Sequence, residues 1–177
     1  MKIFSKTKYD LKGCYLDISR TIIIGNSGSG KSWLAERLAK NNGGACIDLD
    51  SVNWLGSGYN RARERSEAIE LTKAAASQER WVIEGIYGWL VDEVMSSATA
   101  LIWLRLSEEE CLTNIKSRGR RGNASERSFV DLLEWADTYR TRTGSSSFNA
   151  HQRIFDDFPG PKMILLNRDE VVALADS

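Results

Sequence analysis

Eight consecutive residues near the start of the chain combine glycines, hydroxyl side chains and one lysine: Gly25, Asn26, Ser27, Gly28, Ser29, Gly30, Lys31 and Ser32. This spacing satisfies the phosphate-loop pattern, a glycine followed after four residues by glycine, lysine and serine or threonine. Such glycines permit a tight turn whose backbone N–H groups bind an anion, and a following helix N-terminus adds a favourable dipole. The pattern therefore predicts a site for the phosphates of a nucleotide.

Lys31 and Ser32 have separate expected roles in this pattern. Lys31 should reach the β and γ phosphates of ATP, and the Ser32 hydroxyl should bind the Mg²⁺ ion that bridges them during phosphoryl transfer. The alternative interpretation is a glycine-rich turn that holds no ligand. An apolar run at residues 21–24 precedes the pattern and a helical periodicity at residues 33–40 follows it. This context favours ATP and Mg²⁺ as ligands.

Carboxylates at the ends of predicted strands form a second group. Asp48 and Asp50 close the predicted strand 45–49, where alternation would turn both side chains to one face, and Glu84 closes the predicted strand 81–84. Parallel sheets bind ligands at the carboxyl ends of their strands. Asp50 could accept a proton from an acceptor hydroxyl or hold Mg²⁺, and Glu84 could bind the metal through water. For Asp48, a solvated turn carboxylate is the alternative.

A third group is basic. Residues 116–142 contain seven basic and four acidic side chains, a local net charge of +3. Guanidinium groups on a mobile segment can close over transferring phosphates and stabilise the transition state. Arg118 and Arg121 are the candidates for this catalytic role, and a solvated basic surface is the alternative. The arginines of the predicted helix 61–77 could bind an anionic acceptor, but neighbouring glutamates favour surface ion pairs.

The segments that carry these groups read as alternating strands and helices. Strands are predicted at residues 21–24, 45–49, 81–84, 100–106 and 163–166. Helices are predicted at residues 33–40, 61–77, 87–97, 108–116, 128–140 and 169–175, and loops at residues 118–127 and 141–149. Repeated βα units predict an α/β fold, a parallel sheet covered by helices on both faces. Residues 1–19 precede the first core strand and could add a hairpin or an edge strand.

Composition excludes several classes of protein. The 177 residues are 42% hydrophobic and 27% charged, which is typical of one soluble globular domain and not of a disordered or fibrous chain. Lys plus Arg and Asp plus Glu both number 24, so no global charge attracts nucleic acid or a membrane. No apolar stretch approaches the ~18 residues of a membrane span, so we expect a cytoplasmic protein.

Isolated side chains are assigned to structure and not to chemistry. Cys14, Cys46 and Cys111 are odd in number, and we expect buried, reduced thiols. His151 is the single histidine, and we expect a structural role for it. Most of the tryptophans are expected in the core: Trp54, Trp81, Trp89, Trp103 and Trp135. Two of them, Trp54 and Trp89, lie near the predicted acceptor side and could instead contact the acceptor.

Several of these segments together resemble a known family. Four segments resemble those of the adenylate-kinase-like P-loop proteins. They are the strand with its phosphate loop, Leu49-Asp50 followed by Trp54, the segment Trp81-Val-Ile-Glu-Gly-Ile-Tyr-Gly88, and Ile102-Trp-Leu followed by a helix that ends at Arg118. The most similar members are the small ATPases known as DNA topology modulation proteins. The resemblance spans residues 20–175 approximately, and the phosphate loop is its most specific part.

The resemblance implies a fold of the nucleoside and nucleotide kinase type. It implies a three-layer αβα sandwich with a five-stranded parallel sheet in the order 2-3-1-4-5, an acceptor-binding insert at about residues 51–80 and a lid at about residues 118–149. It places Arg118 at the base of that lid. The chain departs from adenylate kinases at Glu84-Gly85-Ile86-Tyr87, which lacks their arginine, and at Asn114, where they carry another arginine. The pair of aspartates resembles shikimate-kinase-like enzymes.

Two hypotheses about function follow. In the first, residues 20–177 form a phosphotransferase that moves the γ-phosphoryl group of Mg-ATP to a nucleotide, a nucleoside or a small hydroxyl acceptor. In the second, the protein is a regulatory ATPase of the DNA topology modulation type, which hydrolyses ATP without a small-molecule acceptor and contacts a phosphate backbone with its arginines. The neutral net charge disfavours a nucleic-acid partner. The sequence is silent on the acceptor's identity and on oligomeric state.

Overall fold

The computed structural model describes residues 8–11, 14–56, 61–120 and 125–176. The strands are β1 (Lys8–Leu11), β2 (Cys14–Asp17), β3 (Arg20–Gly25), β4 (Ala45–Asp48), β5 (Trp81–Gly85), β6 (Ala100–Leu104) and β7 (Lys162–Leu165). The helices are α1 (Lys31–Asn42), α2 (Leu49–Asn53), α3 (Arg65–Ala76), α4 (Gly88–Val94), the 3-10 turn η1 (Met95–Ser97), α5 (Glu108–Arg118), α6 (Glu126–Asp137), α7 (Phe148–Asp157) and α8 (Arg168–Asp176). The five strands β3 to β7 and the helices α1, α3, α4, α5, α6 and α8 match predicted segments, whereas α2 and α7 were not predicted.

Five strands form an all-parallel sheet in the order β4-β5-β3-β6-β7. Counted along the chain from the first core strand, this order is 2-3-1-4-5, so the predicted fold class is confirmed. The central strand β3 pairs Ile22 with Ile83 on one side and with Leu101 on the other. Connections from β3 leave toward both halves of the sheet, and ligands of such sheets bind in the crevice beyond this point. The segment after β3 therefore lies at the expected ligand site.

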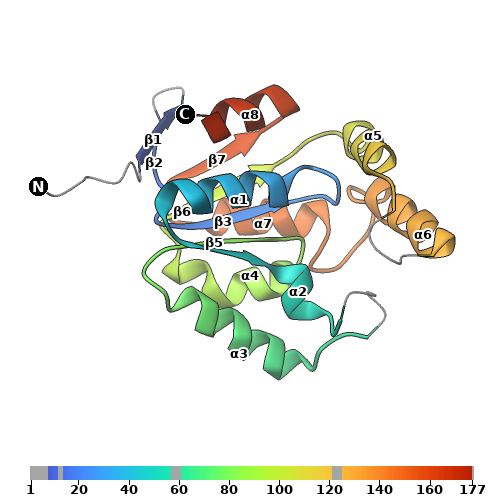
Figure 1. Ribbon diagram of the computed structural model, residues 1–177, viewed down its shortest axis with the longest axis horizontal. Coiled ribbons are helices and arrows are strands. Elements are labelled where there is room, and N and C mark those ends of the chain that lie inside the picture. Colours follow the sequence, from blue (N-terminus) through green and yellow to red (C-terminus); the bar gives the residue numbers. More distant parts are fainter. Residues whose placement is uncertain (1–7, 12–13, 57–60, 121–124, 177) are drawn as a thin grey trace, which may run out of the picture.

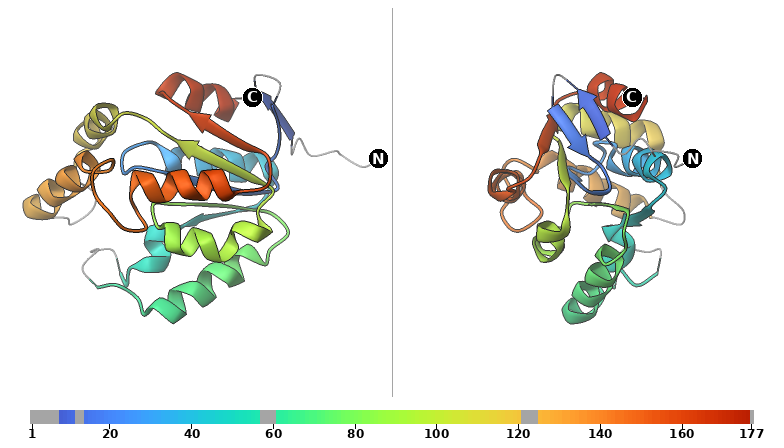
Figure 2. Two further views of the ribbon diagram at one scale, coloured as in Figure 1. Left: turned by 180° about the vertical axis from the view of Figure 1, so that it is seen from behind. Right: turned by 90° about the vertical axis from the view of Figure 1, so that its left-hand side faces the viewer.

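Alternation along the buried strands divides the core into two layers, one on each face of the sheet. Ile23 packs with α1, α5 and α8 side chains in one layer, where Leu34, Leu38 and Leu174 are fully buried. Ile22 and Ile24 point to the other layer, which packs against α2, α3, α4 and α7. Figures 1 and 2 show the resulting three layers, with α1 on one side of the sheet and α4 and α7 on the other.

Several elements differ from the sequence-based expectation, and helix α2 begins at Leu49, where a strand was expected. Helix α3 begins at Arg65 and not at residue 61, because residues 61–63 pair with the chain after α2 through Leu55 and the bridge of Trp54 with Ala62. The strand predicted at 100–106 ends at Leu104. Helix α7 was not predicted, because a serine-rich run precedes it and its first residues fall in the loop predicted at 141–149. The last serine of that run, Ser147, caps the helix: its side chain accepts a hydrogen bond from the Ala150 N–H.

The N-terminal segment adds a hairpin and not an edge strand of the main sheet. Strands β1 and β2 form their own two-stranded antiparallel sheet. Leu16 and the following Ile18 are fully buried in the core layer of α1 and α8. In Figure 1 this hairpin lies at the opposite end of the molecule from α5 and α6. Among the described residues, no helix combines the length and the apolar character needed to span a bilayer.

Candidate active site

The phosphate loop connects the end of β3 to the first turn of α1. Gly28 and Gly30 have φ angles of +80° and +93°, which belong to the left-handed region that favours glycine. A Cβ atom on Gly28 would lie 2.4 Å from the Cys111 carbonyl oxygen of α5. The loop thus needs glycine at position 28 for two reasons, its backbone conformation and the close approach of α5.

The side chains of Lys31 and Asn26 form hydrogen bonds that hold the phosphate loop in its conformation. The Lys31 ammonium group donates to the Asn26 carbonyl oxygen at 2.9 Å, and the residue is 9% exposed. The Asn26 side chain accepts from the Ser27 N–H at 2.8 Å and donates to the Ala136 carbonyl oxygen at 2.7 Å. Asn26 therefore ties the loop to the end of α6, which is 110 positions away in the sequence.

Ser32 faces a buried carboxylate. Its hydroxyl donates to Glu84 Oε1 at 2.5 Å, across the boundary between α1 and β5, and Glu84 is 3% exposed. Burial raises the pKa of Glu84 above its ordinary value, nearby Asp48 and Asp50 raise it further, and Lys31 and the Ser32 hydrogen bond oppose the rise. The carboxylate thus sits where a nearby cation would stabilise its charged form.

This oxygen pair fits a magnesium ion. Hydroxyl and carboxylate oxygens are the hard donors that Mg²⁺ prefers, and Mg²⁺ usually keeps several waters and substrate oxygens as ligands. No cluster of three or more His, Cys, Asp or Glu side chains that could hold a metal ion occurs in the described part of the chain. A metal at Ser32 and Glu84 would therefore share its ligand shell with substrate phosphate and water.

Asp48 and Asp50 differ in structural role, and the expected shared strand face is wrong. The strand stops at Asp48, whose side chain accepts from the Asp50 N–H at 2.8 Å and so caps α2. Asp50 lies in the first turn of that helix, where an acidic side chain is favoured by the helix dipole. The alternative of a structural turn carboxylate thus holds for Asp48, while Asp50 lines the central cavity.

A chain of hydrogen bonds orients Asp50. The Tyr87 hydroxyl donates to Asp50 Oδ1 at 2.7 Å, and Trp54 Nε1 donates to the Tyr87 oxygen at 2.7 Å. Burial, together with the adjacent Asp50 charge, raises the pKa of Tyr87, so the phenol keeps its proton. Tyr87 precedes α4 and Trp54 follows α2. Two side chains from separate segments, Tyr87 and Trp54, thereby orient the Asp50 carboxylate.

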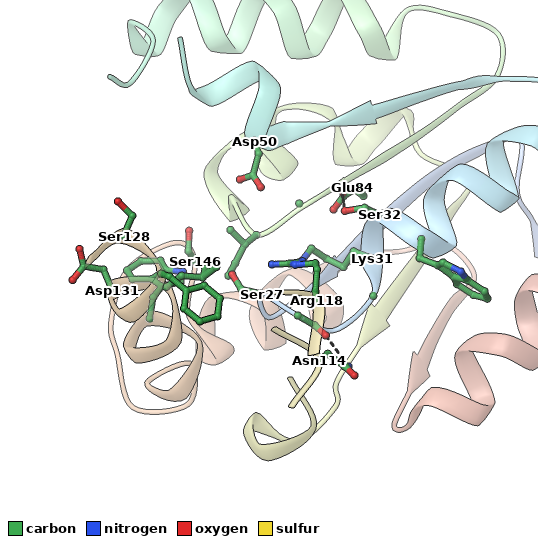
Figure 3. A pocket seen from close by; sticks show the side chains of 18 of the residues that line it. Ser27, Lys31, Ser32, Asp50, Glu84, Asn114, Arg118, Ser128, Asp131 and Ser146 are labelled. Atoms are coloured by element: carbon green, nitrogen blue, oxygen red, sulfur yellow. Dashed lines mark hydrogen bonds between the residues drawn. The ribbon is translucent and has the colours of Figure 1, made fainter. Parts of the chain in front are cut away.

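These groups line one cavity of about 1240 Å³. Its walls come from the phosphate loop, the ends of β4 and β5, and helices α5 and α6. Figure 3 shows Lys31 and Arg118 in its middle, Asp50 and Glu84 on one side, and Ser128 and Asp131 approaching from α6. The lining residues include Ser27, Gly28, Gly30, Lys31, Ser32, Trp33, Asp50, Trp54, Glu84, Tyr87, Asn114, Arg118, Phe129, Asp131, Trp135, Ser146 and Arg168.

Comparison with known families decides the class of protein. A family model described as an AAA domain matches residues 22–131, which include the phosphate loop, Asp50, Glu84 and Arg118. The chain belongs to this AAA domain family of P-loop proteins. The match extends over more than half of the chain and places nucleotide binding at the glycine-rich loop. No curated protein matches the sequence.

Solved structures similar to this AAA domain protein share its fold. A gluconokinase from Sinorhizobium meliloti 1021 has a TM-score of 0.54 at 16% identity, covering 90% of this chain and 88% of its own. A shikimate kinase from Acinetobacter baumannii in complex with shikimate has a TM-score of 0.53 at 16% identity, covering 89% of each chain. A sugar kinase from Janibacter sp. HTCC2649 has a TM-score of 0.52 at 12% identity, covering 88% and 89%.

The arginines of this AAA domain protein occupy different environments. Arg118, the last residue of α5, is exposed and lines the cavity beside the phosphate loop. Arg121 lies outside the described residues. Asn114, one turn before Arg118, donates to the Gly28 carbonyl oxygen at 2.9 Å and so supports the loop. Arg63 pairs with Glu67 at 2.5 Å, which confirms the surface ion pair expected there.

Trp135 was wrongly expected in the core, whereas Trp54 lines the cavity, in line with the alternative position near the acceptor. Trp81 and Trp103 are fully buried as predicted, but Trp135 is 44% exposed and lines the cavity, as does the half-buried Trp54. Helical periodicity alone puts Trp135 on the apolar face of α6, and that face turns toward the cavity together with Phe129. The sequence shows that α6 has an apolar face, but it does not show whether that face points to the core or to the cavity.

His151 and the cysteines belong to the structure and not to the chemistry. His151 is fully buried in α7, where Nδ1 lies 2.5 Å from the Tyr139 hydroxyl and Nε2 lies 3.0 Å from the Ile86 carbonyl oxygen. Burial lowers the pKa of His151 to about 3. Cys111 is buried as expected, whereas Cys46 is exposed because β4 is an edge strand; the side chain of Cys14 lies outside the described ones.

Proposed function

We propose that this protein is an ATP-dependent phosphotransferase, which moves the γ-phosphoryl group of Mg-ATP to a hydroxyl group of a small acceptor. The observation that carries the proposal is a shared cavity: Lys31 and Ser32 of the phosphate loop and the oriented carboxylate of Asp50 line the same space. A phosphate site beside a fixed proton acceptor supplies the two parts that phosphoryl transfer to a hydroxyl requires.

In the proposed reaction, the acceptor oxygen forms a bond to the γ-phosphorus of ATP. The bond from that phosphorus to the bridging oxygen of the β-phosphate breaks, ADP leaves, and the hydroxyl proton passes to an Asp50 oxygen. The Tyr87 hydroxyl donates to Oδ1 of Asp50, so Oδ2 is the oxygen available to the acceptor. Asp50 therefore acts as the general base.

Positive charge stabilises the phosphates in this scheme. In this scheme Lys31 contacts the β and γ phosphates and Arg118 approaches from α5. Arg121, the second arginine proposed for catalysis, lies outside the described residues. Ser32 and Glu84 hold Mg²⁺, and Asp50 is the third candidate ligand. When bound, the metal neutralises part of the charge that the transferring phosphoryl group carries.

We also propose that the protein belongs to the adenylate-kinase-like branch of P-loop proteins, near the small DNA topology modulation ATPases. The structures that share its fold include a gluconokinase and a shikimate kinase, which supports a kinase over a purely regulatory ATPase. Residues 20–177 would form the single kinase-like domain. Within it, residues 51–80 would form the acceptor-binding insert and residues 118–149 the lid.

The test is transfer of γ-labelled phosphate from Mg-ATP to pooled acceptors. A labelled product is expected from the unmodified protein, and Lys31→Ala should reduce its formation at least about a hundredfold, because a donor aimed at the transferring charge is lost. Lys40→Ala, an exposed lysine at the other end of α1, is the matched control and should retain activity. Label released only as free phosphate would support the regulatory ATPase instead, and unchanged turnover in Lys31→Ala would refute the phosphate-loop assignment.

A further inference from the structure

One side of the cavity has a composition that selects among acceptors. We define the acceptor wall as Asp50, Trp54, Tyr87, Phe129, Asp131 and Trp135, all of which line the cavity. Asp50, Trp54 and Tyr87 come from the α2 and α4 ends, and the other three come from α6. Figure 3 shows Asp50 at the α2 end and Asp131 on the α6 side of the cavity, each apart from Lys31.

The wall offers negative charge and aromatic surface. Two of its six members are carboxylates and the other four are aromatic. The Trp54 N–H and the Tyr87 hydroxyl are already paired with each other and with Asp50, so these side chains present mainly their rings to the cavity. Trp135 is 44% exposed and presents a large apolar ring there. Such rings favour a flat or apolar partner.

The cations that line the cavity lie elsewhere. Among the described lining residues they are Lys31, Arg118 and Arg168. Lys31 donates within the phosphate loop, and Arg168 lies over the Trp33 ring, 4.1 Å from its centroid, at the start of α1. Under the proposed function, Lys31 and Arg118 serve the phosphates of ATP. Among the described residues, the acceptor wall therefore contains no cation that could bind an anionic group of the acceptor.

Three further arginines do not line the cavity, and each contacts another side chain or the backbone. Arg142 stacks 3.8 Å above the Trp135 ring, but its guanidinium donates to the carbonyl oxygens of Trp135 and Ser146, and it does not line the cavity. Arg65 lies 4.4 Å from the centroid of the Trp89 ring, and Arg63 is paired with Glu67. Among the described residues, the acceptor wall therefore offers an anion two carboxylates and no guanidinium group of its own.

We infer, on the basis of the proposed function, that the acceptor is an uncharged hydroxyl compound with a flat or apolar ring, the chemical class of nucleosides. A phosphate or carboxylate on the acceptor would lie beside Asp50 and Asp131, and repulsion between like charges disfavours that complex. The hydroxyl of a neutral acceptor meets Asp50, and its ring stacks on the aromatic part of the wall. Nucleoside monophosphates and sugar acids are the acceptors that this arrangement excludes.

The experiment compares matched pairs that differ in charge. Label transfer from Mg-ATP is measured for each of four nucleosides and for the corresponding 5′-monophosphate, and for neutral sugars and the corresponding sugar acids. At least one nucleoside should be phosphorylated with kcat/KM about tenfold or more above its monophosphate. Preference for a monophosphate or a sugar acid by the unmodified protein would overturn the inference while leaving the proposed phosphotransferase intact.

The second part of the experiment reverses the charge of one residue of the acceptor wall. Asp131→Lys places a cation on an exposed position of α6 that lines the cavity, and it should narrow the ratio of kcat/KM between the nucleoside and its monophosphate about tenfold. Asp137→Lys makes the same change at an exposed position of the same helix that does not line the cavity, and it should leave the ratio unchanged. An unaltered ratio in Asp131→Lys would refute the role of the wall.

The two proposals fail in different ways. If the unmodified protein binds Mg-ATP and releases only free phosphate with every member of the panel, the phosphotransferase proposal fails, and the acceptor inference fails with it. If an anionic member is the better acceptor, only the acceptor inference fails. Asp131 is exposed, so its replacement leaves the core unchanged, and circular dichroism of each variant verifies the fold.

Discussion

Asp50 shows how a single side chain is prepared for chemistry. Its position in the first turn of α2 is set by the Asp48 cap, and its orientation is set by the Tyr87 hydroxyl. The Tyr87 oxygen in turn accepts from Trp54, so the phenolic proton is directed at the carboxylate. A carboxylate held by a packed hydrogen-bonded neighbour loses little freedom when a substrate arrives.

Removing that neighbour should lower activity without unfolding the protein. Tyr87→Phe deletes the hydroxyl that orients Asp50, so we expect kcat to fall roughly tenfold while KM for ATP is retained. Steady-state kinetics with varied ATP at a saturating acceptor concentration measure both constants. In an Asp50→Asn background, the same Tyr87→Phe change should have almost no further effect, because both substitutions act on one carboxylate. Additive losses in the double variant would contradict the orienting role.

At the scale of elements, the phosphate loop depends on how closely α5 approaches it. Gly28→Ala combines a φ angle of +80° with a Cβ atom 2.4 Å from the Cys111 carbonyl oxygen, so the loop must move away from α5. We expect loss of ATP binding, measured by calorimetric titration. Gly43→Ala is the matched control, since φ is +69° but no atom lies within 4 Å of the new Cβ. It should cost about 1 kcal/mol of stability and keep ATP binding.

Helix α7 is fixed through His151, which joins it to the Tyr139 hydroxyl and to the chain after β5. Burial lowers the pKa of His151 from 6.5 in the unfolded chain to about 3 in the folded protein. Because the folded state disfavours protonation, this contribution to stability is complete above pH 6.5 and is lost as pH falls toward 3.

The expected slope is up to about 1.4 kcal/mol per pH unit in that window. Urea unfolding of the unmodified protein and of His151→Gln at several pH values between 4 and 7 measures it. The glutamine amide can form hydrogen bonds but does not titrate, so the stability difference between the two proteins should shrink toward acid pH. A pH-independent difference would show that His151 is not buried in its neutral form.

At the scale of the whole molecule, the cavity lies at the carboxyl edge of the sheet, where segments from both layers of the core meet. The cavity takes residues from α1, the ends of β4 and β5, and α5 and α6, so a ligand in it adds contacts between segments that are already joined by hydrogen bonds such as Asn114 to Gly28. A ligand that binds only the folded state stabilises it by mass action. Nucleotide binding should therefore raise the melting temperature.

Mg-ATP at about one hundred times its Kd should stabilise the protein by roughly 2.7 kcal/mol, equivalent to a rise of about 5–10 °C in Tm. Differential scanning fluorimetry with and without Mg-ATP measures the shift. Adding EDTA should reduce it, because Ser32 and Glu84 would lose the metal that joins them to the phosphates. An equal shift in Gly28→Ala would place the nucleotide away from the loop.

The sequence by itself determined the features that depend on neighbouring residues. Gly25 to Ser32 specifies the phosphate loop through spacing alone, and apolar β-branched runs specify the buried strands of a parallel sheet. Asp50, Glu84 and Arg118 were also predicted to lie at the ligand edge, because residues at strand and helix ends of such a sheet meet there, and all three line the cavity. The helix over 148–157 was missed because a polar serine run hides its cap.

Only the tertiary structure decided which distant residues meet. Tyr87 contacts Asp50 across 37 positions, Asn26 reaches Ala136 across 110, and Trp135 turns its ring to the cavity because of how α6 packs against α5. Local patterns fix the face of an element but not its direction in space, since direction depends on contacts that form only when remote segments pack together. The chemical character of the acceptor wall therefore belongs to the fold and not to any single motif.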